Sequence, residues 1–145
     1  FFLDEDAMVL SRGLLPHEMV HAWCGKFRRP AGVTFDDFGE TIDSSLLWVY
    51  EGLTSYLDAV LTARAGFMTF DDFREELAIT AAEQDARAGR AWRPVADTAV
   101  SAQKVFEAAG GWKSRRRAAD FYPESVLIWL GADVVIRSRT TRSIR

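Results

Sequence analysis

Residues 46–61 read LLWVYEGLTSYLDAVL, and the spacing of their apolar side chains decides the fold class. These side chains recur every three or four positions, as on one face of an α-helix, at Leu46, Tyr50, Leu53, Leu57, Val60 and Leu61. Asp43 or Ser44 can cap the start of this helix, and Gly66 suits the position after its end at Ala65. The stretch therefore predicts a long amphipathic helix.

The same signals predict four further helices, over residues 12–25, 70–88, 97–109 and 121–137. Thr69 and Asp72 resemble a capping box at the start of the helix over residues 70–88. Its buried stripe is expected at Phe70, Phe73, Leu77 and Ala81. Residues 26–42, 90–97 and 112–119 are expected to be loops or linkers.

The last of these helices is apolar almost all round, so we expect it to be central and buried. Its β-branched cluster leaves a strand as the alternative. Because every other periodic stretch is helical, the expected fold class is mainly α.

The composition is that of one folded domain over residues 1–145, with 48% hydrophobic and 27% charged residues. A net charge of −3 argues against a nucleic-acid surface, and a single cysteine, Cys24, excludes an internal disulfide. No apolar run is long enough to span a membrane. The chain begins without Met or a signal-peptide pattern, which predicts a piece of a longer polypeptide whose compartment stays open.

The strongest chemical signal is His17-Glu18-Met19-Val20-His21, which contains both histidines of the chain. A spacing of four places the two imidazoles on one helix face, where both can bind one metal ion, and zinc suits such nitrogen ligands. Glu18 can take a proton from a metal-bound water without being a ligand. The alternative is a helix with two ordinary histidines and no metal.

Glu51 is the candidate for the third ligand that a catalytic zinc site needs. A carboxylate beside a dense apolar stripe is costly to bury unless it is paired or binds a metal. Gly52 lowers helix propensity by about 1 kcal/mol, which favours a close approach of the backbone to the first helix. The alternatives are an exposed glutamate and a simple packing glycine.

Several segments match one known family in the right order, over nearly the whole chain after residue 10. They are HEMVHAW (17–23), KFRRP (26–30), WVYEGLT (48–54) and DFYPE (120–124), followed by WL (129–130) and IR (136–137). On these segments the chain resembles the glycyl aminopeptidase family of gluzincin zinc metallopeptidases, which often carry a PDZ domain. The resemblance implies a thermolysin-like helical catalytic domain, a zinc cofactor and cleavage of peptides from the amino end.

The resemblance also implies roles for residues outside the zinc motif. Tyr122 matches a family tyrosine, and related aminopeptidases use a tyrosine to stabilise the oxyanion. Glu124 is a second polar group expected in the same cleft. Ser55 stands where family members have an acidic residue that can orient a ligating imidazole, so we expect weakened metal binding.

Further family features have no counterpart in these 145 residues. Residues 1–10 lack the family's glycine-rich substrate-placing segment, and neither the N-terminal β domain nor the PDZ domain fits. Arg28 and Arg29 follow the zinc motif and could bind a substrate carboxylate, or pair with Asp36 and Asp37. The expected setting is bacterial, cytoplasmic or periplasmic, without a nucleic-acid partner.

The sequence thus predicts a zinc-dependent peptidase of aminopeptidase type that acts on peptide substrates. Two alternatives stay open. One is a non-catalytic domain that keeps the family fold to bind a peptide or a partner, and the other is a helical structural domain whose motif is incidental. An intact Glu18 argues against the first, because an inactive domain has no need of the base.

Overall fold

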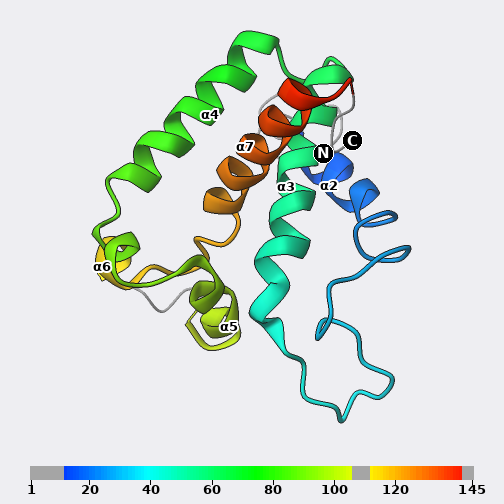
Figure 1. Ribbon diagram of the computed structural model, residues 1–145, viewed down its shortest axis with the longest axis vertical. Coiled ribbons are helices and arrows are strands. Elements are labelled where there is room, and N and C mark those ends of the chain that lie inside the picture. The colour runs from blue at the N-terminus through cyan, green and yellow to red at the C-terminus, as the bar shows by residue number, and fades with distance from the viewer. Residues whose placement is uncertain (1–11, 106–111, 142–145) are drawn as a thin grey trace.

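The computed structural model describes residues 12–105 and 112–141, which form a mainly α fold and so confirm the expected fold class (Figure 1). The helices are α2 (Leu14–Val20), α3 (Leu47–Arg64), α4 (Phe70–Asp85), α5 (Val95–Val105), α6 (Lys113–Arg116) and α7 (Pro123–Arg139). Short 3₁₀ helices η1 and η2 cover Ser44–Leu46 and Ala88–Ala91. Within the described residues the β structure is an isolated bridge between Cys24 and Arg28.

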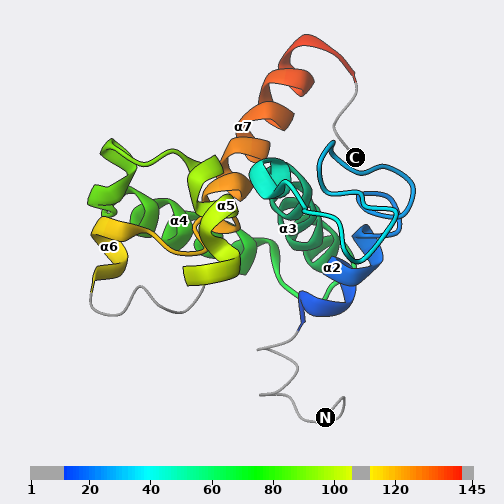
Figure 2. The same ribbon diagram turned by 90° about the horizontal axis from the view of Figure 1, so that it is seen from below.

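Helices α3 and α7 lie side by side at the centre of the molecule (Figure 1). Helix α2 packs on α3, and α4 packs mainly on α7, while α5 packs against η1 and the start of α3. Seen from below, α2 and the long loop after it lie on one side of α3, and α4, α5 and α6 lie on the other (Figure 2). The residues of the His17–His21 motif therefore approach the central helix α3 from the side on which α2 lies.

The end of α3 lies within one residue of the prediction, but its start is later than predicted, because Asp43 caps η1 and α3 begins at Leu47 after Leu46, which has no side-chain capping bond. The Asp43 side chain accepts a hydrogen bond from the Ser45 N–H before the helix, and Gly66, with φ of +80°, follows Ala65 at its end. The side chains buried on α3 are nevertheless small or polar: Gly52, Thr54, Tyr56 and Thr62. The expected apolar stripe is only partly buried. Four apolar side chains on or next to α3 line an apolar groove between this helix and residues 23–30. They are Leu46, Val49, Leu53 and Leu57.

The helix expected over residues 12–25 is shorter, because α2 ends at Val20 and His21 caps it. Turns follow instead, in which the Cys24 N–H binds the Val20 carbonyl and the Gly25 N–H binds the Arg28 carbonyl. A Cβ at Gly25 would lie 2.7 Å from the Tyr50 hydroxyl, so only glycine allows the turn to approach α3 this closely.

Helix α4 begins with the expected capping box between Thr69 and Asp72 but ends at Asp85 rather than at residue 88. Its predicted stripe is wrong at two positions, since Phe70 and Ala81 are exposed. The helix packs on α7, Phe73 and Leu77 line cavities together with α7 side chains, and Gln84 is fully buried.

Residues 26–42 contain no helix, as expected, but the other two segments expected as linkers contain some. The linker over residues 90–97 is interrupted by η2 and by the start of α5 at Val95, and residues 113–116 of the expected loop form α6. The predicted end of the fourth helix at residue 109 lies outside the described residues.

Helix α7 starts with Pro123 in its first turn, as expected, and the strand alternative is wrong. Its position is central, but the expectation of burial all round fails because Ile128, Val134 and Val135 are exposed. Among the described residues no helix has the length and apolar character needed to cross a bilayer.

The close contact between α3 and α7 occurs at Gly52. A Cβ at this position would lie 2.1 Å from the Ser125 Cβ, a distance that no folded structure tolerates. The backbone approach anticipated for Gly52 therefore exists, but its partner is α7 and not the first helix.

We expect Gly52→Ala to destabilise the protein by about 1–3 kcal/mol, because the added methyl group forces α3 and α7 apart. Gly131→Ala is the matched control, since Gly131 also lies inside a helix but has nothing within 4 Å of its Cβ position. That change should stabilise by about 0.5–1 kcal/mol through helix propensity. Urea unfolding of both variants measures the difference, and equal effects would contradict the assigned contact.

Candidate metal centre

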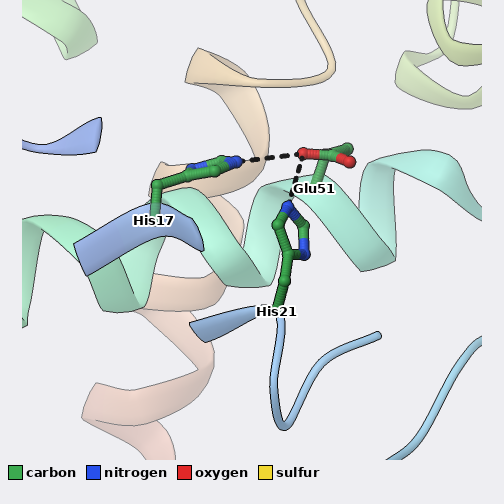
Figure 3. A group of neighbouring side chains, drawn as sticks. All are labelled: His17, His21 and Glu51. Carbon is green, nitrogen blue, oxygen red and sulfur yellow. Dashed lines mark ion pairs between the residues drawn. The ribbon is translucent and has the colours of Figure 1, made fainter. Parts of the chain in front are cut away.

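Three side chains converge between α2 and α3. The Nε2 atoms of His17 and His21 lie 3.3 and 3.7 Å from Oε2 of Glu51, and all three ligand atoms lie within 4.8 Å of one another (Figure 3). Donor atoms about 2.0–2.2 Å from a tetrahedral zinc ion lie about 3.3–3.6 Å apart. The structure thus brings together the three residues that the sequence predicts as ligands, and the two nitrogen–oxygen distances are close to this spacing.

The local fold explains this convergence. His17 lies in α2 and His21 directly after it, and the spacing of four keeps both rings on the side that faces α3. The His21 ring stacks on Tyr50 at 4.9 Å between centroids, and the two histidine rings meet edge to face at 4.8 Å. Because Tyr50 directly precedes Glu51, one turn of α3 both supports an imidazole and supplies the carboxylate.

Hydrogen bonds on the far side of each ring orient the two histidines. Nδ1 of His17 lies 2.8 Å from Oδ2 of Asp58, and Nδ1 of His21 lies 3.0 Å from the Cys24 carbonyl oxygen. Both partners are acceptors, so Nδ1 carries the proton in each ring and the Nε2 lone pair points toward Glu51. Two imidazole nitrogens and one carboxylate oxygen form the donor set of a catalytic zinc site.

Asp58 is the site residue that the sequence reasoning missed. It follows Glu51 by seven residues, which is about two helical turns and places both carboxylates on one face of α3. Burial raises the pKa of Asp58 to about 6, against the opposing hydrogen bond with His17. Ser55, where an acid was expected, lies beside Asp58 in a pocket of about 290 Å³. The orienting carboxylate is therefore present one turn further along the helix.

Glu18 and Tyr122 lie beside the three ligands. Burial, followed by the charge of Glu51 and a hydrogen bond with it, raises the pKa of Tyr122 to about 12, and the charge of Glu18 adds to this shift. Tyr122 also lines the pocket that holds Asp58. The contact of Gly52 with α7 accounts for this proximity, because it seats the start of α7 on the turn of α3 that carries Glu51.

The remaining predicted residues lie in other surroundings. Arg28 stacks over the Phe27 ring at 5.3 Å, and Nε of Arg29 donates to the Gly25 carbonyl at 2.5 Å. Both line the apolar groove, and neither forms an ion pair with an aspartate within the described residues. Glu124, expected in the substrate cleft, has its carboxylate paired with Arg90 and Arg117 instead.

Cys24 is half-buried rather than exposed. Its Sγ donates to the Tyr50 carbonyl at 3.4 Å, and burial raises the pKa of the thiol. A raised pKa lowers the population of the reactive thiolate.

Comparison with models of known protein families shows to which family the chain is related. The M61 glycyl aminopeptidase family matches residues 11–128 of the chain. The chain belongs to this family of peptidases. No curated protein sequence matches it significantly. The matched segment of the M61 chain contains all three converging residues, as well as Glu18, Asp58 and Tyr122.

We expect Asp58→Asn to weaken zinc binding by this M61 chain about 10–100-fold, because an amide holds the His17 Nδ1–H less strongly than a carboxylate. Ser55→Ala serves as the control and should leave zinc affinity unchanged. Competition titration against a chelator measures both. Weakening by Ser55→Ala but not by Asp58→Asn would show that the wrong residue has been assigned to His17.

Proposed function

We propose that the chain is a zinc-dependent aminopeptidase domain that hydrolyses the first peptide bond of substrates with a free amino end. The observation that carries the proposal is the convergence of His17, His21 and Glu51 with both Nδ1 atoms held by acceptors. Membership of the M61 family supports the reaction class. When bound, zinc supplies Lewis acidity, which makes water acidic near neutral pH and polarises a carbonyl group.

Glu18 is the proposed general base. It is next to His17 on α2 and is exposed, so its carboxylate is free to accept the proton of the attacking water. The same group then passes that proton to the amine that leaves. It needs no bond to the metal for either step.

Tyr122 is the proposed oxyanion donor. A hydroxyl whose pKa is raised to about 12 keeps its proton throughout the neutral range. It can therefore donate a hydrogen bond to the negative charge that develops on the substrate oxygen. The charge of Glu51 and a hydrogen bond with it contribute to this raised pKa, which supports a position of the hydroxyl close to the proposed ligand.

Two measurements test the proposal. Metal analysis of the purified chain should give one zinc per chain, and a glycyl peptide should be hydrolysed in a way that a chelator stops and added zinc restores. The N-acetylated form of the same peptide should resist. Zinc uptake without hydrolysis would favour the non-catalytic binding domain, and no uptake would favour an incidental motif.

We expect Glu18→Gln to lower kcat about 10²–10⁴-fold, because the amide cannot accept a proton. Zinc content and thermal unfolding should stay as in the wild type, since Glu18 neither binds the metal nor packs in the core. Glu75→Gln removes one exposed carboxylate from α4 and should not change turnover. Wild-type turnover by Glu18→Gln would reject the role of the base.

A further inference from the structure

Three arginines from different parts of the chain meet at the start of α7. Arg87 follows α4, Arg90 lies in η2, and Arg117 precedes α7. Their partners are two acidic residues, Asp120 and Glu124, which lie two positions before and after Tyr122. We refer to these five charged residues as the arginine cluster.

Each of the four carboxylate oxygens of the arginine cluster contacts an arginine, and Arg117 contacts two of them. Asp120 is held by Arg87 at Oδ1 (3.1 Å) and by Arg117 at Oδ2 (3.0 Å). Glu124 is held by Arg90 at Oε1 (3.1 Å) and by Arg117 at Oε2. Arg117 thus joins both acids, and the other two arginines fix each acid from its second side.

Arg117 is built into the fold at a cost. Its side chain is only 1% exposed, and its φ of +59° lies in the left-handed region that residues with a Cβ rarely adopt. Its Nη1 also donates to the Arg93 carbonyl. Gly89 makes room for it, because a Cβ there would lie 2.6 Å from the Arg117 Cγ. A buried charged side chain on a residue with an unfavourable backbone conformation is stable only where several neighbouring contacts hold it in place.

Tyr122 depends on its flanking residues for its position. It precedes the first residue of α7 and has no side-chain capping bond of its own. The Tyr122 N–H donates to the Ala119 carbonyl, and the Glu124 N–H donates to the Asp120 carbonyl. The backbone turn that carries Tyr122 therefore lies between the two acids that the arginines bind. Its ring packs on Phe121, which is buried in the core.

We propose that Arg117, assisted by Arg87 and Arg90, is a positioning residue that holds the Tyr122 hydroxyl beside Glu51 by fixing Asp120 and Glu124. This inference rests on the oxyanion role proposed for Tyr122. It assigns to Glu124 a role in fixing the start of α7 in place of a contact with substrate. The arginine cluster acts on the chemistry only through the tyrosine.

A double-mutant cycle on hydrolysis of a glycyl peptide tests this coupling in the zinc-loaded chain. Tyr122→Phe should lower kcat about 10²–10³-fold, the usual effect of removing one oxyanion donor. Arg117→Lys keeps the charge but cannot span both acids, and it should lower kcat about 10²-fold, the scale of a small misplacement. In the Tyr122→Phe background, Arg117→Lys should cost almost nothing more, with KM and zinc affinity unchanged throughout. Multiplying losses would overturn the proposal.

Arg90→Gln provides a milder variant in case Arg117→Lys does not fold, and Arg137→Gln is its matched control. The two arginine side chains are 39% and 47% exposed, and each pairs with an acid on α7, Glu124 for Arg90 and Asp133 for Arg137. Arg90→Gln should lower kcat in the same tyrosine-dependent way, whereas Arg137→Gln should leave kcat unchanged. An equal loss in both would show a general loss of α7 stability and overturn the proposal.

Fluorine NMR of 3-fluorotyrosine-labelled protein separates positioning from activity. The chain has three tyrosines, so each signal can be assigned with one Tyr→Phe variant. Arg117→Lys and Arg90→Gln should move the Tyr122 signal. Arg137→Gln should move that of Tyr56 instead, because Asp133 accepts from both Arg137 and the Tyr56 hydroxyl at 2.8 Å.

The NMR result stands whether or not the chain hydrolyses peptides. If the wild type or Tyr122→Phe contradicts the oxyanion role, a Tyr122 signal that moves in the arginine variants still supports the positioning. A Tyr122 signal that stays in place in both Arg117→Lys and Arg90→Gln overturns it.

Discussion

The position of Tyr122 beside the candidate metal centre depends on the contact at which Gly52 of α3 meets Ser125 of α7. A side chain at position 52 would occupy the space of the Ser125 Cβ, so the two helices approach to backbone distance only because this residue is glycine. Glu51 is the residue before this contact, and Tyr122 lies three residues before Ser125. The contact therefore sets the separation between a proposed metal ligand and the proposed oxyanion donor, which come from helices distant in sequence.

Polar contacts outside the centre then fix the direction of each group within it. Asp58 and the Cys24 carbonyl hold the rear nitrogens of the two imidazoles. Arg117 and its partners hold both ends of the segment that carries Tyr122. Buried ion pairs are weak sources of stability, since the loss of hydration offsets much of their attraction. Their contribution here is to orient the side chains and backbone that they contact. Orientation matters because an oxyanion donor accelerates a reaction only if it is in place before the charge develops.

The sequence predicts those parts of the site that depend on local periodicity. The four-residue spacing of His17 and His21 places them on one helix face whatever the tertiary structure, and the capping signals locate the start of η1 and of α4. Tertiary partners are not encoded in this way. The partner of Gly52 depends on which helix packs on α3, and Arg87 and Arg90 lie 33 and 34 residues in sequence from the acids that they hold, Asp120 and Glu124. The sequence alone could have predicted Asp58 as a site residue, because a spacing of seven residues from Glu51 places it on the same face of a helix.

The geometry of the three candidate ligands also favours a cation between them. With each Nδ1–H held by an acceptor, the Nε2 lone pairs of His17 and His21 face the carboxylate of Glu51 at 3.3 and 3.7 Å. Lone pairs and a negative charge repel one another at this distance unless positive charge lies among them. A proton on one imidazole relieves one contact, whereas a divalent cation relieves all of them at once. The fold holds this repulsive group together through contacts on its outer side, such as those of Asp58 and the Cys24 carbonyl with the two imidazoles. A divalent cation would therefore meet ligands that are already in place.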